Sequence, residues 1–418
     1  MSHIGYVTTL FPSMTMFVEA EVKGLVRRGH RVTVFTLRKP PRRYQPEHEA
    51  LMPFVRYVGS PVRAASWAAG AAQLATRPLA VGRDVVHVLG ASLGDRYAMA
   101  GHAGYLPAAF AVARAARREG IERLHGAWAH FPASVAWLAS RWSGTRFSFS
   151  AHAGADLHRS RAFLGAKVRA ADFVSTCVRG NVATLLAVAP DAADRVHCIY
   201  HGVDLSRFDG QGRAQDETPL FLSIGALRAA KGFDAGIEAV ARLRAQGVHV
   251  RYAIVGDGTE REALGGLIAR HGLGDRVELL GEKPQRELLP LYRRAWALVH
   301  PSVIMPNGRR DGIPNVVIEA MAMGLPCVGT RAAGLEEAIE EGVTGWLAPP
   351  RDPDGIARGM QRIVEDRAGA AIMGRAAAAR ARRDFDVTRN FERLAELFER
   401  PWDGEAPRVA GALAEVAS

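Results

Sequence analysis

Residues Asp311 to Thr330 read DGIPNVVIEAMAMGLPCVGT, and this stretch decides the fold of the second half of the chain. Pro314 has no backbone N–H and suits the first turn of a helix, so we expect a short buried helix to begin at Asn315. Gly324 suits the end of that helix, and the residues after it predict a short buried strand. A single charged residue, Glu319, lies inside this apolar run.

Asp311 and Glu319 flank the N-terminus of the predicted helix. That helix end presents free N–H groups and the positive end of the helix dipole, which together suit a phosphate. Burial of an unpaired carboxylate is unfavourable, so Glu319 requires a partner. Either the two carboxylates belong to a ligand site, or Asp311 caps the helix and Glu319 pairs with an arginine. The stretch alone leaves both interpretations open.

The stretch resembles the donor-sugar motif of glycosyltransferase family 4. The resemblance is carried by Asp311, Gly312, Pro314, Glu319-Ala320 and Gly324-Leu325-Pro326, and the run IEAMAMGLP is similar to that of bacterial exopolysaccharide transferases of the colanic-acid type. The family usually has Glu where this chain has Asp311, whose side chain is shorter by one methylene. The resemblance implies an α/β chain of the GT-B fold, with two Rossmann-like domains facing each other across a cleft, and a retaining reaction.

The length of 418 residues has room for two domains. We expect an N-terminal acceptor-binding Rossmann-like domain over residues 1–208 and a C-terminal nucleotide-sugar-binding domain over 218–384. The polar segment between them, 209–217, suits a hinge. The resemblance also implies a C-terminal helix over 385–401 that crosses back to the first domain, and we expect 402–418 to be a loose tail.

Charge is distributed unevenly along the chain. Residues 1–215 carry 27 Lys and Arg against 14 Asp and Glu, a net charge of +13, whereas residues 216–418 carry 27 against 29. No nucleic-acid-binding signature accompanies this basic half. A first domain that faces anionic lipid, or a pyrophosphate-linked acceptor, fits better. The Ala-rich stretch 61–120 reads as helices of the first domain, and contact with a membrane surface is the alternative interpretation of its basic, apolar-faced helices.

The remaining global features favour a cytoplasmic chain. Three cysteines, Cys177, Cys198 and Cys327, lie in apolar runs without metal-ligand spacing and read as reduced core residues. The first residues predict a strand instead of a signal peptide, and no apolar run is long enough to span a bilayer. We expect a cytoplasmic protein, with peripheral contact at the inner face of the plasma membrane. Neither GxGxxG after the first strand nor a P-loop is present, so a nicotinamide enzyme and a P-loop NTPase are not supported.

The first half alternates strands and helices, which predicts a parallel, doubly wound sheet that binds ligands at the carboxyl ends of its strands. Ser13 and Thr15 follow the first strand in a loop similar to the FPSxT form of the exopolysaccharide subgroup, and we assign them to the acceptor side. His130 also follows a strand and receives an acceptor-side role. His152 matches the histidine with which the family contacts the donor sugar near the reaction centre.

The second half has further turns at strand ends. Lys231 and Gly232 match the turn with which the family binds the donor diphosphate, but Ala226 stands where the family has Arg, and we expect Arg228 to replace that arginine in part. The resemblance implies the following donor-binding residues: Glu319, Lys231, Arg228, Gly312, Ile313, Pro314, Asn315, Gly256, Glu282 and Lys283.

No metal site is expected. Asp352-Pro353-Asp354 spells the metal-binding DxD of another glycosyltransferase fold, but it precedes a predicted helix, which favours a capping role. The diphosphate leaving group would be stabilised by the cationic turn and the helix N-terminus near Asn315. We expect no cofactor; the co-substrate is a nucleotide sugar, with a UDP-sugar favoured.

These observations favour a retaining hexosyltransferase that moves a hexose from a nucleotide-diphosphate sugar to a lipid-linked saccharide acceptor. The reaction would belong to exopolysaccharide or lipopolysaccharide biosynthesis. Asp311 and His152 would be its catalytic residues. Two alternatives remain open. One is glycosylation of a secondary metabolite such as an aminocyclitol antibiotic, and the other is a sugar-nucleotide-binding protein without turnover, marked by the departures at Asp311 and Ala226.

Overall fold

The computed structural model of the chain describes residues 1–12, 16–39, 46–59, 64–152, 157, 159–210, 212–306, 312–332 and 334–401. It forms two compact units. Unit 1 consists of Met1–Ile199 and the chain from Phe391 onward, and unit 2 consists of Tyr200–Asn390.

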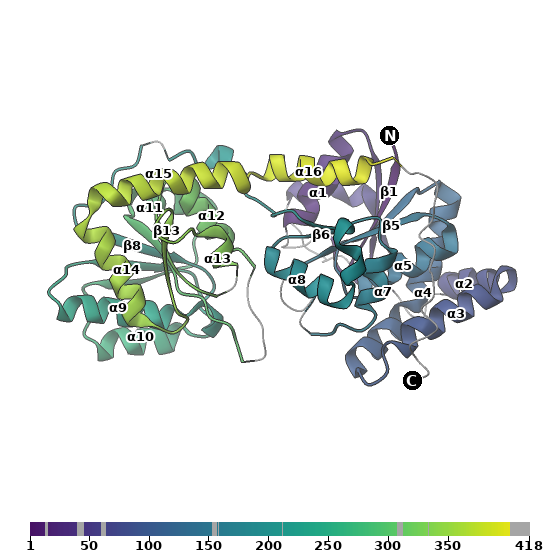
Figure 1. Cartoon of the computed structure of the whole chain (residues 1–418), viewed down its shortest axis with the longest axis horizontal. Coiled ribbons are helices and arrows are strands. Elements are labelled where there is room, and N and C mark those ends of the chain that lie inside the picture. Colours follow the sequence, from purple (N-terminus) through teal and green to yellow (C-terminus); the bar gives the residue numbers. More distant parts are fainter. Residues whose placement is uncertain are drawn as a thin grey trace. The chain divides into compact units, whose positions relative to one another are not determined.

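Unit 1 is built on a parallel sheet, of which Figure 1 labels β1, β5 and β6. Its seven strands lie in the order β3-β2-β1-β4-β5-β6-β7. Its strands are β1 (His3–Thr8), β2 (Arg31–Thr36), β3 (Val55–Tyr57), β4 (Arg123–Gly126), β5 (Arg146–Ala151), β6 (Val174–Thr176) and β7 (Val196–Cys198). Its helices are α1 (Met16–Arg27), η1 (Pro46–Phe54), α2 (Ala64–Thr76), α3 (Pro78–Gly90), α4 (Arg96–Glu119), α5 (Phe131–Ser143), α7 (Leu164–Ala170), α8 (Arg179–Val188), η2 (Pro190–Arg195) and most of α16 (Val387–Glu399).

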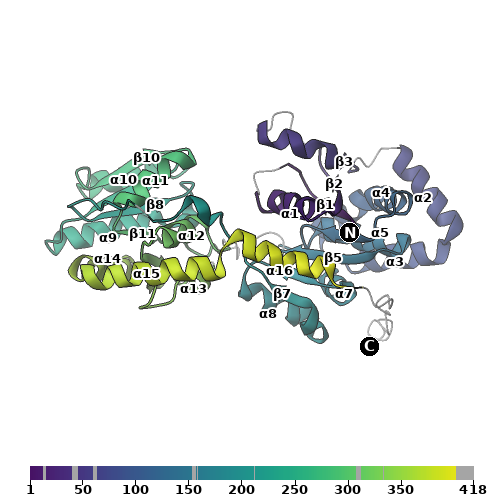
Figure 2. The same cartoon turned by 90° about the horizontal axis from the view of Figure 1, so that it is seen from above.

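Unit 2 is built on a parallel sheet, of which Figure 2 labels β8, β10 and β11. Its six strands lie in the order β10-β9-β8-β11-β12-β13. Its strands are β8 (Leu220–Ile224), β9 (Arg251–Val255), β10 (Val277–Gly281), β11 (Ala297–His300), β12 (Cys327–Thr330) and β13 (Gly345–Ala348). Its helices are η3 (Leu205–Arg207), η4 (Ala229–Lys231), α9 (Phe233–Ala245), α10 (Arg261–Arg270), α11 (Gln285–Arg294), α12 (Asn315–Ala322), α13 (Leu335–Ala338), α14 (Pro353–Glu365) and α15 (Arg367–Asp384).

The central strands are apolar on both faces because helices cover both faces of each sheet. In β1, Ile4 and Tyr6 pack with α1 and α16, whereas Val7 packs on the opposite face with α4 and α5. In β8, Leu222 packs with α11, α12 and α15, whereas Phe221 packs with α9, α10 and α14. Figure 1 shows α9, α10 and α14 together on one side of β8. The expected doubly wound α/β architecture is therefore confirmed in both halves.

Each sheet has a point where the strand order reverses. In unit 1 this point lies between β1 and β4, and in unit 2 it lies between β8 and β11. In open α/β sheets, ligands bind outside the carboxyl ends of the strands at such a point. A ligand site in unit 2 is therefore expected at the segments that follow β8 and β11.

The last helix, α16, places an apolar stripe in the core of unit 1. Leu394, Leu397 and Phe398 are buried against residues of β1 and β2. Phe391 lies against α1 at Gly24, where an added methyl group would come within 2.3 Å of its ring. The carboxylate of Glu399 accepts hydrogen bonds from Arg28 at 2.8 Å, and His30 Nε2 lies 3.1 Å from it. These two neighbours lower the pKa of Glu399 to about 2.

The boundary between the units lies ahead of the expected one at residue 208. Val203 and Phe208 are buried in the core of unit 2, so the residues after Ile199 belong to that unit. The described part of the expected hinge, 209–217, is also fastened to unit 2. Asp216 accepts two hydrogen bonds from Arg294, at 2.9 and 2.8 Å, and Arg213 donates to the carbonyl oxygens of Gly324 and Ala295.

Residues 402–418, expected to be a tail, lie outside the described residues. Among the helices that the structure describes, none has both the length and the apolar character that crossing a membrane requires.

Candidate active site

Two glycine-bearing turns meet at the carboxyl edge of the unit 2 sheet. Gly225 follows β8, and Gly256 and Gly258 follow β9. A methyl group added to Gly256 would lie 1.9 Å from the carbonyl oxygen of Gly225, and one added to Gly258 would lie 2.4 Å from that of Leu227. Only glycine permits backbones to approach this closely. The backbones of the turns that follow β8 and β9 are therefore in direct contact.

The turn after β8 is also tied to the segment after β11. Gly232 has a φ of +63°, and a methyl group there would lie 2.1 Å from the carbonyl oxygen of Pro301. The amide of Val303 donates to the carbonyl oxygen of Ala230 at 3.0 Å. Both contacts lie where the strand order of the sheet reverses, so this turn borders the expected ligand position.

Lys231 lies over the end of β8. Its Cε is 3.5 Å from the position that a Cβ would take on Gly225. Arg228, the expected partial substitute for the missing arginine, is exposed in the same turn, and its carbonyl oxygen accepts from the Lys231 amide at 2.9 Å. The structure therefore brings both cations to one turn, and their contact with a diphosphate stays a prediction.

Glu319 lies one turn into α12 and is buried, with 7% of its surface exposed. The hydroxyl of Tyr292, on α11, donates to its Oε2 at 2.8 Å. Burial raises the pKa of Glu319; hydrogen bonds from Tyr292 and Gln285 and the charge of Arg207 act in the opposite direction. Burial also raises the pKa of Tyr292, well above its ordinary value.

Among the described residues, the groups that contact Glu319 or act on its charge are the Tyr292 hydroxyl, Gln285 and the charge of Arg207. Sequence reasoning missed Tyr292 as a partner. The available signal was the seven-residue spacing of Gln285 and Tyr292, which puts both polar groups on one face of a helix.

The start of α12 is held in place by a tight backbone contact. Pro314 precedes the first helical residue with extended geometry, φ −70° and ψ 131°, as its position in the sequence predicted. A methyl group on Gly334 would lie 2.6 Å from Cγ1 of Ile313, and the Gly334 amide donates to the carbonyl oxygen of Gly312 at 3.3 Å. Residues 312–315 thus lie at the helix N-terminus; Asp311 lies outside the described residues.

The remaining donor-side candidates follow β10. Glu282 is exposed, and Lys283 Nζ lies 3.7 Å from Glu287 on α11. The amide of Gly256 donates to the carbonyl oxygen of Gly281 at 2.8 Å, which joins the end of β9 to that of β10. The structure therefore places all described donor-side candidates along one edge of one sheet.

In unit 1, His152 follows β5 and is buried between two aromatic rings. The ring centroids of Phe17 and Trp128 each lie 4.6 Å from that of His152. Its Nε2 lies 3.0 Å from the carbonyl oxygen of Ala127, so this nitrogen carries a proton and donates. The imidazole is thus held in one orientation at the carboxyl edge of the unit 1 sheet; its role toward a sugar stays a prediction.

His130 immediately precedes α5, and a buried lysine fixes its backbone. Lys167 Nζ donates to the carbonyl oxygens of Ala129 and His130 and to Ser134 Oγ. His102 Nε2 lies 2.9 Å from the same Ser134 hydroxyl. Burial, followed by the charge of Lys167, lowers the pKa of His102 to about 3, so this imidazole is neutral. Ser13 and Thr15, the other acceptor-side candidates, lie outside the described residues.

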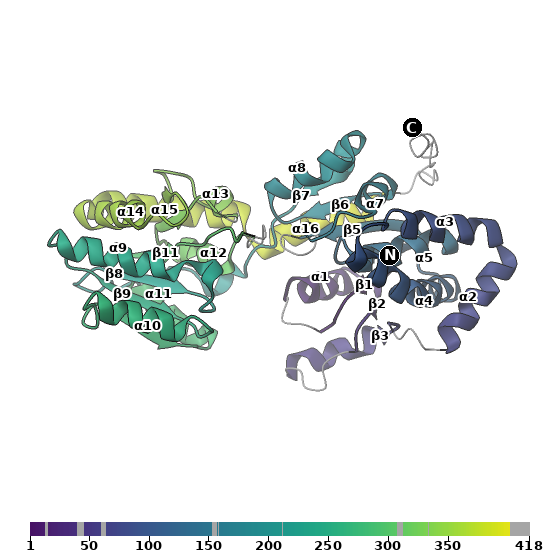
Figure 3. The same cartoon turned by 90° about the horizontal axis from the view of Figure 1, so that it is seen from below.

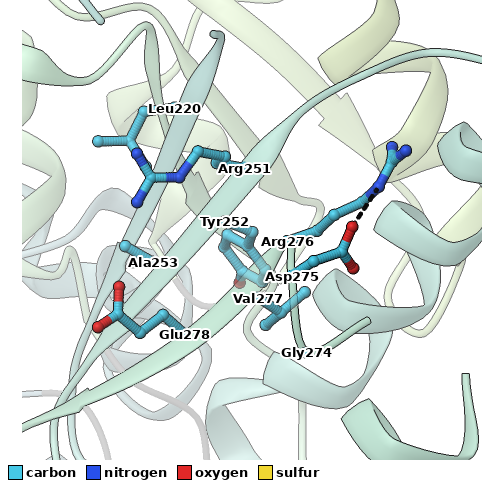
Figure 4. A pocket seen from close by; sticks show the side chains of 9 residues that line it. All are labelled: Leu220, Arg251, Tyr252, Ala253, Gly274, Asp275, Arg276, Val277 and Glu278. Carbon is cyan, nitrogen blue, oxygen red and sulfur yellow. Dashed lines mark ion pairs between the residues drawn. The ribbon is translucent and has the colours of Figure 1, made fainter. Parts of the chain in front are cut away.

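Asp352 has the capping role that the sequence predicted. It precedes α14, and its side chain accepts from the Gly355 amide at 2.9 Å. A hollow of about 100 Å³ opens at the amino ends of β8, β9 and β10, where Figure 4 shows Arg251, Arg276 and Glu278 on its walls. It lies at the edge of the sheet opposite the candidate site and is not part of it.

Two family models match the chain in succession. Residues 14–207 match the model described as Glycosyltransferase Family 4, and residues 206–380 match that of Glycosyl transferases group 1. The chain belongs to glycosyltransferase family 4.

The relatives of this family 4 glycosyltransferase include chains of exopolysaccharide assembly. It is 34% identical over 209 residues to the amylovoran biosynthesis glycosyltransferase AmsK of Erwinia amylovora, a match that covers 50% of this chain and 51% of AmsK. It is 38% identical over 158 residues to the putative colanic acid biosynthesis glycosyltransferase WcaL of Escherichia coli, covering 38% of this chain and 39% of WcaL. The chain thus spans about half or less of these curated relatives.

The fold of this family 4 glycosyltransferase is GT-B. The crystal structure of Anabaena HepE in complex with UDP matches 96% of the chain and 100% of its own, with a TM-score of 0.69 and 19% identity. At this identity the match shows the fold alone. The α/β GT-B fold expected from the donor-sugar motif is confirmed.

Proposed function

We propose that the chain transfers a hexose from a nucleotide-diphosphate sugar to a saccharide acceptor in bacterial exopolysaccharide assembly. The observation that carries this proposal is the edge of the unit 2 sheet, where the Lys231 turn, the start of α12 and the buried Glu319 follow neighbouring strands. The names of AmsK and WcaL support exopolysaccharide as the product class.

Each group at this edge suits one part of such a donor. Lys231, Arg228 and the backbone amides at the start of α12 would supply positive charge and N–H donors for the diphosphate. Glu319 would accept hydrogen bonds from the ribose hydroxyls, with Tyr292 holding its carboxylate. The backbone of the segments at Gly256 and at Glu282-Lys283 would contact the base.

A UDP-sugar is the donor we favour, and the structure of HepE in complex with UDP is an example of a chain of this fold with that nucleotide bound. Retention at the anomeric carbon and a lipid-linked acceptor are further parts of the proposal. Asp311 and residues 312–315 would orient the hexose, and His152 would contact it. We place His130, Ser13 and Thr15 on the acceptor side.

The proposed leaving-group stabilisation comes from Lys231, Arg228 and the α12 amides, with no metal ion. We therefore expect turnover to survive EDTA. Complete loss of turnover in EDTA that Mn²⁺ restores would contradict the metal-free stabilisation of the leaving group. It would not contradict the proposed position of the donor site.

The central experiment measures transfer from UDP-, GDP- and ADP-hexoses to a lipid-linked saccharide, with the product anomer assigned by NMR. We expect transfer from the UDP-sugar with retention. The Asp311→Asn variant should lower kcat about a hundredfold with little change in donor KM. Binding of a donor without any transfer or hydrolysis would instead indicate a sugar-nucleotide-binding protein, and near-normal kcat in folded Asp311→Asn protein would remove Asp311 from catalysis.

A further inference from the structure

The outer surface of α2 is uncharged. The helix buries Ser66, Ala69, Gly70 and Gln73 on one side. Its exposed residues are Ala64, Ala65, Trp67, Ala68, Ala71, Ala72, Leu74, Ala75 and Thr76. A helix at the surface of a globular protein normally presents charged and polar side chains to water. This helix presents alanine, tryptophan and leucine instead.

α3 presents a similar surface. It buries Val81, Asp84 and Val88. Leu79 and Val86, seven positions apart and therefore on the same side after two turns, point away from that buried side and are 88% and 70% exposed. Arg83 lies between them on the same outer side and is also exposed. The outer side of α3 thus combines two apolar side chains with a cation.

Exposed large apolar side chains are concentrated in this part of the fold. Among the described residues there are nine, and five of them lie between residues 67 and 93: Trp67, Leu74, Leu79, Val86 and Leu93. The other four are Met1, Ile304, Val343 and Ile372, which are scattered over both units. We call the exposed residues of α2, α3 and the turn up to Arg96 the α2–α3 surface. It lies at the periphery of unit 1, away from the sheet (Figure 3).

The charges on the α2–α3 surface are positive. Arg77, Arg83 and Arg96 are exposed. The carboxylate of Asp84 has 4% of its side chain exposed and accepts from Arg141 Nε at 2.9 Å, and Arg83 Nε lies 3.5 Å from its other oxygen. Asp95 caps α4 by accepting from the amide of Ala98. Asp95 itself is partly exposed, so three arginines face one partly exposed and one buried carboxylate, and the surface is apolar with a small positive excess.

The α2–α3 surface is supported from below. A methyl group on Gly70 would lie 2.7 Å from the ring of Phe110 on α4, so α2 packs closely against that helix. Gln73 Nε2 donates to the carbonyl oxygen of Trp142 at 3.0 Å. Together with the contact of Asp84 and Arg141, these interactions hold the two helices in place, so the apolar side chains are presented on a preformed platform.

We propose that the α2–α3 surface docks on an anionic membrane. Apolar side chains enter the boundary between headgroups and acyl chains, while arginines contact lipid phosphates. The net charge of +13 over residues 1–215 complements such a surface and adds long-range attraction. A protein partner would not require this combination of a basic unit with a charge-free helix. The inference goes beyond the proposed sugar transfer and does not depend on it.

The test is flotation of the full chain with vesicles, without donor or acceptor. One set of vesicles contains phosphatidylcholine alone, and the other also contains phosphatidylglycerol. We expect binding to the anionic vesicles that weakens with added salt. Leu79→Ser/Val86→Ser should weaken this binding at least about tenfold, because two exposed apolar side chains no longer enter the lipid. Val343→Ser/Ile372→Ser removes a matched pair from unit 2 and should leave binding unchanged.

A second pair of variants tests the charge. Arg77→Gln/Arg83→Gln should weaken binding to the anionic vesicles by about fivefold per arginine, the effect of one cation near such a surface. Arg270→Gln/Arg375→Gln, two exposed arginines of unit 2, is the matched control. Trp67 provides a direct readout of lipid contact. Brominated lipid should quench the tryptophan fluorescence of the wild-type chain, and this quenching should be smaller in Trp67→Phe.

Two outcomes would overturn the proposal. Equal binding of all variants would show that the α2–α3 surface is not the contact. Absence of vesicle binding, together with a dimer in sedimentation velocity that Leu79→Ser/Val86→Ser dissociates, would show instead that this surface joins two copies of the chain. Circular dichroism and melting of each variant exclude loss of folding as the cause of either result.

Discussion

Glu319 is the residue whose surroundings bear most directly on donor binding. We expect Glu319→Gln to raise donor KM about tenfold, the effect of losing one charge-assisted hydrogen bond of about 1.5 kcal/mol. kcat should change little, because ribose contacts are made equally before and during the reaction. Steady-state kinetics with the UDP-sugar measures both constants. A loss confined to kcat would contradict the ribose assignment.

Tyr292 provides the control for this prediction. Its hydroxyl donates to Glu319 at 2.8 Å, and we propose that it positions the carboxylate without contacting the donor. Tyr292→Phe should raise donor KM less than Glu319→Gln does. Because the two residues act through one contact, their effects should not add in the double variant. Full additivity would show that Tyr292 acts on the donor by another route.

Glu21, on α1, should make stability depend on pH. Tyr6 donates a hydrogen bond to it at 2.8 Å, and removal from water raises the pKa of Glu21 from an ordinary value of 4.5 to about 7. Between these values the native state binds more protons than the unfolded state, so the free energy of unfolding falls as pH rises, by up to about 1.4 kcal/mol per pH unit.

Glu21→Gln removes the titrating group and should remove this fall in stability. The measurement is the melting temperature of the wild type and the variant between about pH 5 and about pH 8, where Glu399 is ionised in both proteins. The difference between the two proteins should grow in favour of the variant as pH rises. Parallel curves would show that Glu21 ionises normally in the folded chain.

At the scale of elements, the contact between α1 and α16 depends on Gly24. An added methyl group would lie 2.3 Å from the Phe391 ring, and overpacking of this kind costs about 1–3 kcal/mol. The gain in helix propensity is only about 1 kcal/mol. We therefore expect Gly24→Ala to lower the melting temperature.

The matched control is Gly104, in α4, which has no atom within 4 Å of an added methyl group. Gly104→Ala gains propensity without overpacking and should raise the melting temperature slightly. Phe391→Leu added to Gly24→Ala should restore part of the stability. If Gly24→Ala is as stable as Gly104→Ala, α16 does not pack on α1 as described.

At the scale of the whole molecule, the two units have separate hydrophobic cores. A donor nucleotide that binds at the edge of the unit 2 sheet should therefore slow hydrogen exchange mainly in unit 2. We expect UDP to protect peptides that contain residues 225–232, 256–258 and 312–319. Mass spectrometry of exchanged peptides measures this, and protection confined to unit 1 would contradict the assignment of unit 2 as the donor half.

Local structure was predictable wherever the cause lies in neighbouring residues. Pro314 and Gly324 bracket α12 as expected, because a missing N–H and a positive φ of +75° act within one turn of the chain. Asp352 caps α14 for the same reason. The alternation of strands and helices was sufficient to predict the parallel sheet of the first half, and the resemblance to family 4 implied the second sheet. Strands of such sheets are apolar on both faces because helices cover both.

The order of the candidate residues along the chain also predicted which sheet edge they would share. Lys231, Gly256 and Asn315 each follow a strand, and the carboxyl ends of parallel strands lie at one edge. The resemblance to family 4 supplied the chemical roles. These inferences required only the sequence of elements and the direction of the strands.

Only the tertiary structure decided which distant groups touch. Tyr292 reaches Glu319 because α11 and α12 pack on the same face of one sheet. Residues 200–208 belong to unit 2 because Val203 and Phe208 find their apolar contacts there. Such contacts join residues far apart in sequence, and the free energy that selects them comes from packing the whole core, which no local pattern of residues records.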